Sequence, residues 1–194
     1  MFGDIAGAAA CRQCGAGEYS ATSGASVCGK CLQGTFSAAG ASNCTVCAPG
    51  SASSDGLACV SCKAGEYTPT DGSAACQRCE TAVGSAYTST EGSAVCNLCR
   101  GESYMDVDGI CTSCLEEFGE GAICAEGTTL STLVIKPGFF RTTPDSKKVY
   151  TCTLDEVACP GGNQTGNKLC ADGYEGPLCN RSVWSRSSLA VVAH

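Results

Sequence analysis

The sequence predicts a small disulfide-rich fold, mostly β and irregular, in which an elongated array of disulfide-tied β-hairpins precedes a compact β-rich module. Nineteen of the 194 residues are cysteine, a composition typical of disulfide scaffolds in oxidising compartments. Fourteen of them form seven Cys-x-x-Cys pairs separated by 11 to 16 residues, and this period indicates stacked repeats that contact only their neighbours. Aromatic residues make up only 6% of the chain, so crosslinks must replace most of a hydrophobic core.

Most repeats share a pattern after the second cysteine of the pair, and the third departs from it with Ala52 at the aromatic position. A glycine follows three residues later, as at Gly17 and Gly34, and permits a positive φ where the chain leaves the cysteine. An aromatic follows five residues later and is expected to pack over neighbouring disulfides. Strand-like residues around a second, turn-forming glycine predict a small hairpin tied at its base. The aromatics are Tyr19, Phe36, Tyr67 and Tyr104, with Tyr87 as the counterpart in the longest loop.

The frame Cys-x-x-Cys-x-x-Gly-x-[Tyr/Phe]-[Ser/Thr] ends in Cys14-Gly-Ala-Gly17-Glu-Tyr19-Ser20 in the first repeat. It resembles the cysteine-rich repeats beside the EGF-like region of ephrin receptors and, more loosely, tumour-necrosis-factor-receptor modules. The resemblance covers about residues 11–114. It implies an extracellular spacer or contact module, and it transfers no catalytic residue to this chain.

A different pattern begins after Cys114. Residues 128–141 (TTLSTLVIKPGFFR) form the only long cysteine-free apolar segment, and they predict a strand followed by a turn at Pro137-Gly138. This is the one region where packing can rival crosslinking. The residues expected to form its core are Leu130, Leu133, Val134, Ile135, Phe139, Phe140, Val149 and Tyr150.

The segment from Cys170 to Cys179 (CADGYEGPLC) resembles the last loop of EGF-like domains. The order of repeats, apolar segment and EGF-like loop is similar to that of large surface proteins predicted in algae and other protists. We therefore divide the chain into four parts. They are an N-terminal arm at 1–10, the repeats at 11–114, a β-rich module ending in the EGF-like loop at 115–182, and a C-terminal arm at 183–194.

The cysteines allow a serial pairing in which the second cysteine of each pair joins the first of the next. The interlocked alternative, Cys11–Cys28 with Cys14–Cys31, stays open at this point. Serial pairing gives nine disulfides, each removing on the order of 3 kcal/mol of unfolded-chain entropy, and leaves Cys11 unpaired or intermolecular. The serial pairs are Cys14–Cys28, Cys31–Cys44, Cys47–Cys59, Cys62–Cys76, Cys79–Cys96, Cys99–Cys111, Cys114–Cys124, Cys152–Cys159 and Cys170–Cys179.

Two Cys-x-x-Cys pairs at this separation also suit zinc. We favour disulfides because seven pairs would have to share metal ions and because the Gly/Ser-rich loops and glycosylation sequons indicate an extracellular chain. The only histidine, His194, is the last residue, which removes Cys–His and Ser–His–Asp catalysis. Asp106-Val-Asp108-Gly109 lacks the remaining calcium ligands and predicts a solvated turn. We expect no catalytic residue, no metal and no cofactor.

The formal net charge of −7 disfavours nucleic acid as a partner. No apolar run approaches the roughly 20 residues of a membrane span. Three Asn-x-Ser/Thr sequons, at Asn43, Asn163 and Asn180, fit a secreted or cell-surface glycoprotein. Asn43 is the weakest of the three because a cysteine expected in a disulfide follows it.

These features predict a non-enzymatic extracellular structural glycoprotein that assembles with copies of itself into a filament or surface coat. The C-terminal arm carries a short β-prone run that can add as a strand to a hairpin edge of another subunit. Its expected contact residues are Trp184, Leu189, Val191 and Val192. The alternative is a fragment of a receptor or adhesion ectodomain, with the repeats as spacer and the C-terminal module as contact surface.

Overall fold

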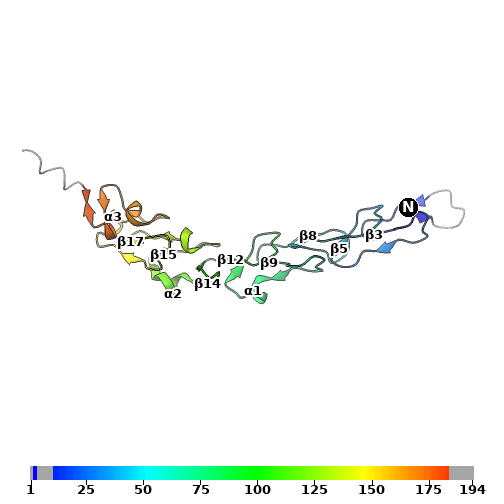
Figure 1. Cartoon of the computed structure of the whole chain (residues 1–194), viewed down its shortest axis with the longest axis horizontal. Helices are drawn as coiled ribbons and strands as arrows, with labels where there is room; N and C mark the ends of the chain where they lie inside the picture. Colours follow the sequence, from blue (N-terminus) through cyan, green and yellow to red (C-terminus); the bar gives the residue numbers. More distant parts are fainter. Residues whose placement is uncertain (1, 4–10, 184–194) are drawn as a thin grey trace, which may run out of the picture. The chain divides into compact units, whose positions relative to one another are not determined.

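The structure, a computed structural model, describes residues 2–3 and 11–183, without the side chains of residues 2, 3, 11 and 155. It divides into two units, Met1–Asn97 and Leu98–His194, which are described separately below. In both units, strands of two or three residues pair into small antiparallel sheets, interrupted by helices of three to five residues (Figure 1). This is the disulfide-rich, mostly β and irregular fold of serial hairpins that the sequence predicts.

The strands of the first unit pair with their sequence neighbours. Because each strand is only two residues long, a hairpin makes few hydrogen bonds of its own and needs its crosslink. The pairs are β1 (Phe2–Gly3) with β2 (Cys11–Arg12), β3 (Glu18–Tyr19) with β4 (Gly29–Lys30), β5 (Thr35–Phe36) with β6 (Thr45–Val46), β7 (Ser51–Ala52) with β8 (Val60–Ser61), and β9 (Glu66–Tyr67) with β10 (Gln77–Arg78). Helix α1 (Cys79–Ala82) and β11 (Tyr87–Thr88) follow.

Each repeat hairpin is closed by a disulfide at a fixed register. In hairpin 1 (residues 14–31), Glu18 faces Lys30. The disulfide joins Cys14, which lies four residues before Glu18, to Cys28, which lies two residues before Lys30. The same offsets hold in hairpins 2 (31–47), 3 (47–62), 4 (62–79) and 6 (99–114).

The nine disulfides of the structure join the serial pairs and not the interlocked ones. Their Cα–Cα distances, 5.4 to 6.5 Å, lie within the usual range for this bond. The backbone of Cys11 lies in β2, but its side chain is outside the described part, so its pairing stays a prediction.

Successive hairpins of the first unit are joined by main-chain hydrogen bonds that recur at each junction. At the first junction, Gly17 N donates to Ser37 O (2.9 Å) and Gly40 N donates to Cys14 O (2.8 Å). Ser37, the acceptor of the first bond, is polar but buried, and its Oγ donates to Glu18 O (2.9 Å). The bonds equivalent to the first are Gly34 N to Ser53 O, Gly50 N to Thr68 O, and Gly65 N to Ser89 O.

Glycine also allows hairpins two positions apart to touch, which corrects the expectation that repeats contact only their nearest neighbours. A Cβ atom built on Gly34, in hairpin 2, would lie 1.8 Å from Gly72 O in hairpin 4. One built on Gly50 would lie 2.0 Å from Gly92 O, in the loop after Cys79. The glycine therefore supplies close backbone approach in addition to its positive φ.

The structure places the aromatic position on the hairpin strands, and in the longest loop this position differs from its prediction. Tyr19 lies over Gly29 on the facing strand, since a Cβ built there would be 2.9 Å from Tyr19 Cε1. In the longest loop, α1 adds residues before the strand. Tyr87 N donates a turn hydrogen bond to Gly84 O, and in the other hairpins the equivalent bond is donated by the residue just before the aromatic position. Thr88, which is buried, therefore occupies the aromatic position, and the placement of Tyr87 there was wrong by one residue.

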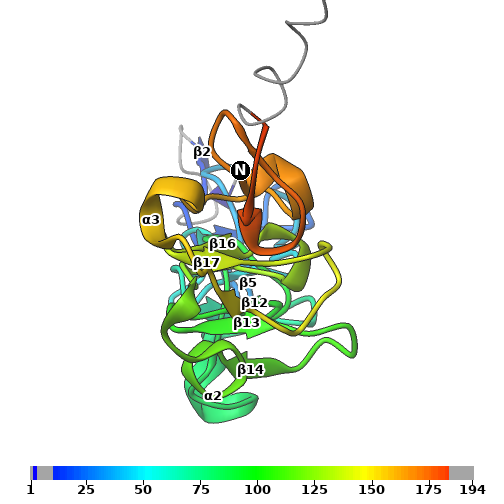
Figure 2. The same cartoon turned by 90° about the vertical axis from the view of Figure 1, so that its left-hand side faces the viewer.

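The second unit alternates small sheets with single helical turns (Figure 2). After β12 (Leu98–Cys99), its sheets are β13 (Ser103–Met105) with β14 (Cys111–Ser113), β15 (Ala122–Ile123) with β16 (Val134–Ile135), β17 (Phe139–Phe140) with β18 (Tyr150–Thr151), and β19 (Tyr174–Glu175) with β20 (Arg181–Ser182). Its helices are α2 (Cys114–Phe118), α3 (Asp155–Ala158) and the 3-10 turns η1 (Gly119–Gly121), η2 (Leu130–Thr132), η3 (Gly166–Leu169) and η4 (Pro177–Cys179).

An apolar core fills the second unit, as the sequence predicts. Most of the expected residues are in it, but Val134 is 36% and Tyr150 42% exposed. Val134 alternates with the buried Ile135 in β16, whereas both residues of β18 are exposed. The rings of Tyr104 and Phe118 pack 4.8 Å apart in the same core. Hairpin 6 therefore packs with the second unit, which begins at Leu98.

One hairpin of this unit keeps the repeat geometry without a disulfide. In β17 and β18, Phe139 faces Thr151. The offsets of the repeat place Ile135 and Val149 where the two cysteines would be, 14 residues apart as in Cys14–Cys28. Ile135 is 1% exposed and Val149 packs against the core. An apolar pair therefore takes the place of the crosslink.

The double substitution Ile135→Cys with Val149→Cys is expected to form an additional disulfide. It should stabilise the second unit by about 3 kcal/mol in the simple loop-entropy estimate, less the apolar packing that it removes. Ile135→Cys with Tyr150→Cys is the matched control, because its second cysteine is one residue out of register. Mass spectrometry of unreduced peptides should find the new bond in the first variant only, and free thiols at 135 and 149 would contradict the register.

Candidate interaction surface

A groove lies at the junction of hairpins 1 and 2. It encloses about 280 Å³ and is formed where β4 passes into the next hairpin. Lys30 and Leu32 flank Cys31, and Leu32 is 78% exposed. The groove is lined by Tyr19, Lys30, Leu32, Thr35, Asn43 and Cys44.

The same groove recurs between hairpins 3 and 4. Counted from the corresponding cysteines, Ala52, Ser61, Lys63, Glu66, Ala75 and Cys76 occupy the same six positions. The volume is also similar, about 290 Å³. We refer to this repeated feature as the junction groove. It follows from the repeat geometry, and its chemistry is set by the side chains that flank the cysteines.

The second unit contains a larger junction groove of about 640 Å³, between hairpin 6 and the loop closed by Cys114–Cys124. Ser113, Leu115 and Ile123 occupy equivalent positions beside these cysteines. Tyr104, at the aromatic position, is buried in the core and does not line the groove. The remaining lining residues include Glu102, Gly119, Glu120, Ala122 and Lys136.

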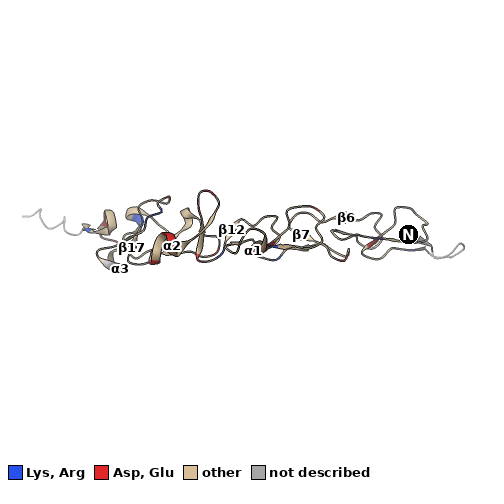
Figure 3. Cartoon of the chain, turned by 90° about the horizontal axis from the view of Figure 1, so that it is seen from below, with Lys and Arg blue, Asp and Glu red and all other residues tan. Residues whose placement is uncertain are grey.

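The junction grooves differ in charge. The groove of hairpins 1 and 2 contains Lys30 and no carboxylate, and that of hairpins 3 and 4 contains Lys63 with two carboxylates. The groove of the second unit contains Glu102 and Glu120 with Lys136. Helix α2 beside it adds further exposed glutamates, shown in red in Figure 3. This groove is therefore acidic at its rim, with Leu115 67% and Ile123 48% exposed.

The asparagines of all three sequons are exposed. Asn43 lines the first junction groove. Asn163 follows the loop after α3, and its Oδ1 accepts a hydrogen bond from Gln164 Nε2 (3.1 Å). Asn180 directly follows η4. None of the three is removed from solvent, which is the condition that N-linked modification requires of a site.

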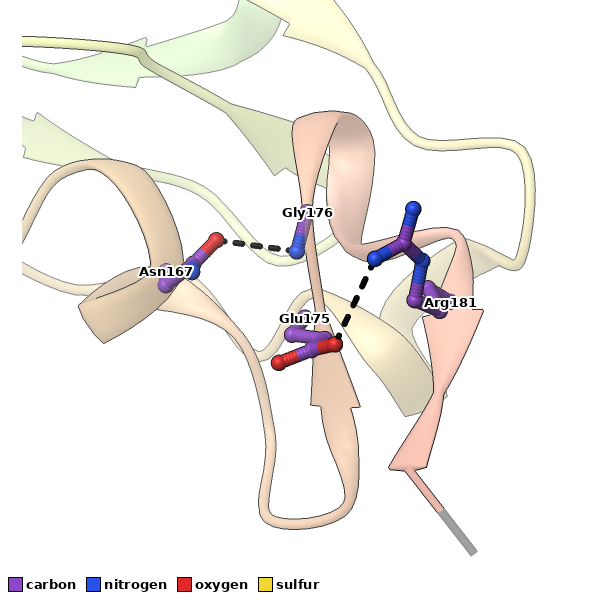
Figure 4. A network of polar contacts seen from close by, with 4 residues as sticks. All are labelled: Asn167, Glu175, Gly176 and Arg181. Atoms are coloured by element: carbon purple, nitrogen blue, oxygen red, sulfur yellow. Dashed lines mark hydrogen bonds and ion pairs between the residues drawn. The ribbon is translucent and has the colours of Figure 1, made fainter. Parts of the chain in front are cut away.

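Figure 4 shows two side-chain contacts of the loop closed by Cys170–Cys179. Asn167 Oδ1 accepts a hydrogen bond from Gly176 N (2.9 Å), and Arg181 lies 3.6 Å from Glu175. Both partners of this ion pair are exposed, so it contributes little to stability. We expect the disulfide to be the main constraint on this loop.

Arg141 and Tyr104 are two of the buried side chains with polar groups in the described part of the second unit. Arg141 is 1% exposed; its Nε donates to Ser146 O (2.8 Å) and its Nη2 donates to Pro144 O. Burial lowers the pKa of this guanidinium, although Asp145 opposes the shift. The cation fixes the 141–146 turn through main-chain carbonyls. It is enclosed by its own loop, so we interpret it as structural.

Tyr104 is the second of these buried side chains. Its hydroxyl makes no hydrogen bond of acceptable geometry to any described residue. Burial raises the pKa of this hydroxyl and Glu117 raises it further, whereas Lys147, which lies near the hydroxyl but outside hydrogen-bond geometry, lowers it. The folded chain therefore favours the neutral phenol.

Tyr104→Phe is expected to stabilise the second unit by about 1 kcal/mol, because it removes a buried hydroxyl without a partner. In the wild type, stability should fall as the pH rises above about 10, where the unfolded chain loses the phenolic proton that the folded chain retains. The variant should lack this contribution. Urea unfolding between about pH 8 and pH 10.5 measures both effects. Equal pH dependence of the two proteins would contradict this assignment.

Several residues singled out in the sequence lie outside the described part. They are the side chain of Cys11 and the arm residues Trp184, Leu189, Val191 and Val192. Asp106 forms a turn, as predicted, because its Oδ1 accepts hydrogen bonds from Asp108 N and Ile110 N, both at 2.9 Å. Within residues 2–3 and 11–183, no three His, Cys, Asp or Glu residues are arranged to hold a metal ion. No helix in that part is long and apolar enough to cross a membrane.

The junction grooves were not predicted from the sequence. Leu115, Ile123 and Glu102 belong to no recognisable motif. Only their positions relative to the cysteines could have indicated that they line a groove. A comparison with known protein families finds no match to this chain. A search of curated proteins finds no relative. The functional argument therefore rests on the residues themselves.

Proposed function

We propose that this chain is a non-enzymatic extracellular structural glycoprotein whose hairpin repeats assemble with further copies into a filament or surface coat. The observation that carries the proposal is the junction between hairpins. It is made of main-chain hydrogen bonds and glycine contacts, as between Gly34 and Gly72, and so depends little on side-chain identity. A contact of this kind can be repeated between chains as well as within one.

The extracellular placement is supported by the cysteine chemistry. Nine disulfides in a chain of this size are typical of secreted and cell-surface proteins. The exposed sequons at Asn43, Asn163 and Asn180 support N-linked glycosylation. The likeness to ephrin-receptor cysteine-rich repeats and to the last EGF-like loop, carried by the motifs described above, supports the same placement.

The alternative is a receptor or adhesion ectodomain in which the repeats act as spacer. The acidic junction groove of the second unit favours it, because a spacer needs a contact surface at one of its modules. The two proposals differ in the partner. The first requires another copy of this chain, and the second requires a different protein.

Negative-stain electron microscopy of native material separates the two. The structural proposal predicts fibres or sheets with a regular axial repeat, whereas single particles at all concentrations would contradict it. Glycopeptide mass spectrometry of the same material should find sugar on Asn163 and Asn180. Unmodified asparagine at all three sequons would remove the glycoprotein part of the proposal.

A further inference from the structure

The junction groove of the second unit combines acidic and apolar surface. Glu102 and Glu120 lie at its rim with Lys136. Leu115 and Ile123 expose apolar side chains beside the Cys114–Cys124 disulfide. Its volume, about 640 Å³, is within the range that encloses one or two large side chains or a small ligand. A segment that is both basic and apolar would complement this surface.

The C-terminal segment of the chain has this character. No Asp or Glu occurs after Glu175, although the whole chain has a net charge of −7. The segment contains Arg181 and Arg186, and it contains Trp184, the only tryptophan. Tryptophan and arginine are the side chains that most often anchor a protein contact.

We propose that the junction groove of the second unit binds residues 184–192 of a second copy of this chain, with Trp184 between Leu115 and Ile123. Arg186 is then near the carboxylates of the rim. This inference rests on the proposed self-assembly and specifies the surface that accepts the arm. Charge distinguishes this groove from that of hairpins 1 and 2, whereas the groove of hairpins 3 and 4 has the same number of carboxylates but carries Lys63 at the position of Leu115. The groove of hairpins 1 and 2 carries Lys30 and no carboxylate, so it repels a basic segment.

The probe is a fluorescein-labelled peptide of residues 181–194 with an amidated carboxyl end, titrated with the full-length chain and followed by fluorescence anisotropy. Leu115→Lys should raise the Kd at least about tenfold, because it places a cation and removes apolar surface in the groove. Leu32→Lys is the matched control. It is the same substitution at the same repeat position, also exposed, and it should change the Kd less than about twofold. Glu120→Lys gives an independent test at a second exposed residue.

Two results would overturn the groove assignment. One is a peptide that does not bind the wild-type chain, and the other is an equal response to Leu115→Lys and Leu32→Lys. Adding salt should weaken binding, because the contact is partly electrostatic. A peptide with Trp184→Ala and Arg186→Glu should not bind.

Sedimentation of the full-length chain distinguishes this inference from the proposed function. Fibres that persist with Leu115→Lys would reject the groove and leave self-assembly standing. A wild-type chain that stays monomeric would reject self-assembly. A monomer in which a photo-crosslinker attached to a cysteine introduced at position 115 reacts with its own arm would show that the segment folds back on the same chain, which also overturns binding by a second copy.

Discussion

Gly34→Ala is expected to destabilise the first unit by about 4 kcal/mol or more, a loss that few single substitutions cause. Gly34 has φ +79°, a conformation that costs an L-residue about 1–2 kcal/mol. The new methyl group would also lie 1.8 Å from Gly72 O. Gly72 O is a backbone atom and the new Cβ is bonded directly to the backbone, so neither can rotate away. Hairpins 2 and 4 must therefore separate to accommodate the methyl group.

Gly24→Ala is the matched control for this prediction. Gly24 has nearly the same φ, +80°, but a Cβ there would meet no atom within 4 Å. It should therefore show only the conformational cost of about 1–2 kcal/mol. Urea unfolding with intact disulfides, followed by tyrosine fluorescence, compares the two variants. Equal losses would mean that hairpins 2 and 4 are not in contact.

Reduction of the disulfides is expected to unfold the first unit completely. In its described part, the only buried apolar side chains are Ala52 and the four cysteines Cys14, Cys47, Cys62 and Cys79. Its five disulfides contribute roughly 3 kcal/mol each in the loop-entropy estimate. Their sum is comparable with the whole stability of an ordinary domain.

The second unit should respond differently to reduction. It loses four disulfides but keeps the apolar cluster that includes Leu133, Ile135 and Phe140. Amide hydrogen exchange read by mass spectrometry should show complete loss of protection across residues 14–97 and residual protection near residues 130–140. Full protection of residues 14–97 after reduction would show that the first unit does not depend on its crosslinks.

The hairpins could be predicted from the sequence because cysteine and glycine have few structural alternatives. A cysteine pair in an oxidised chain fixes which segments meet, and Gly17 or Gly34 fixes where the chain turns. The core at Leu133, Ile135 and Phe140 could be predicted because it is the only apolar segment without cysteine.

The junctions could not be predicted in the same way. Their hydrogen bonds join main-chain atoms, as between Gly40 N and Cys14 O, and main-chain atoms leave no pattern in a sequence. The contact of Gly34 with Gly72 was not predicted, because the turns in which the two glycines lie already accounted for a glycine at each position. The groove at Leu115 and Ile123 differs from the others in that Tyr104 lies in the core and does not line it. That placement follows from packing against Phe118, which the repeat pattern does not contain.

Serial disulfide pairing is the claim on which the hairpins, the junctions and the grooves all depend, and trypsin digestion of the unreduced, denatured chain tests it directly. Cleavage after Arg12 and Lys30 separates each of the first two Cys-x-x-Cys pairs and releases residues 13–30, which contain Cys14 and Cys28. Serial pairing predicts that this peptide appears alone, with one internal disulfide. Finding it crosslinked to the peptides that carry Cys11 and Cys31 would establish the interlocked pairing and contradict the account.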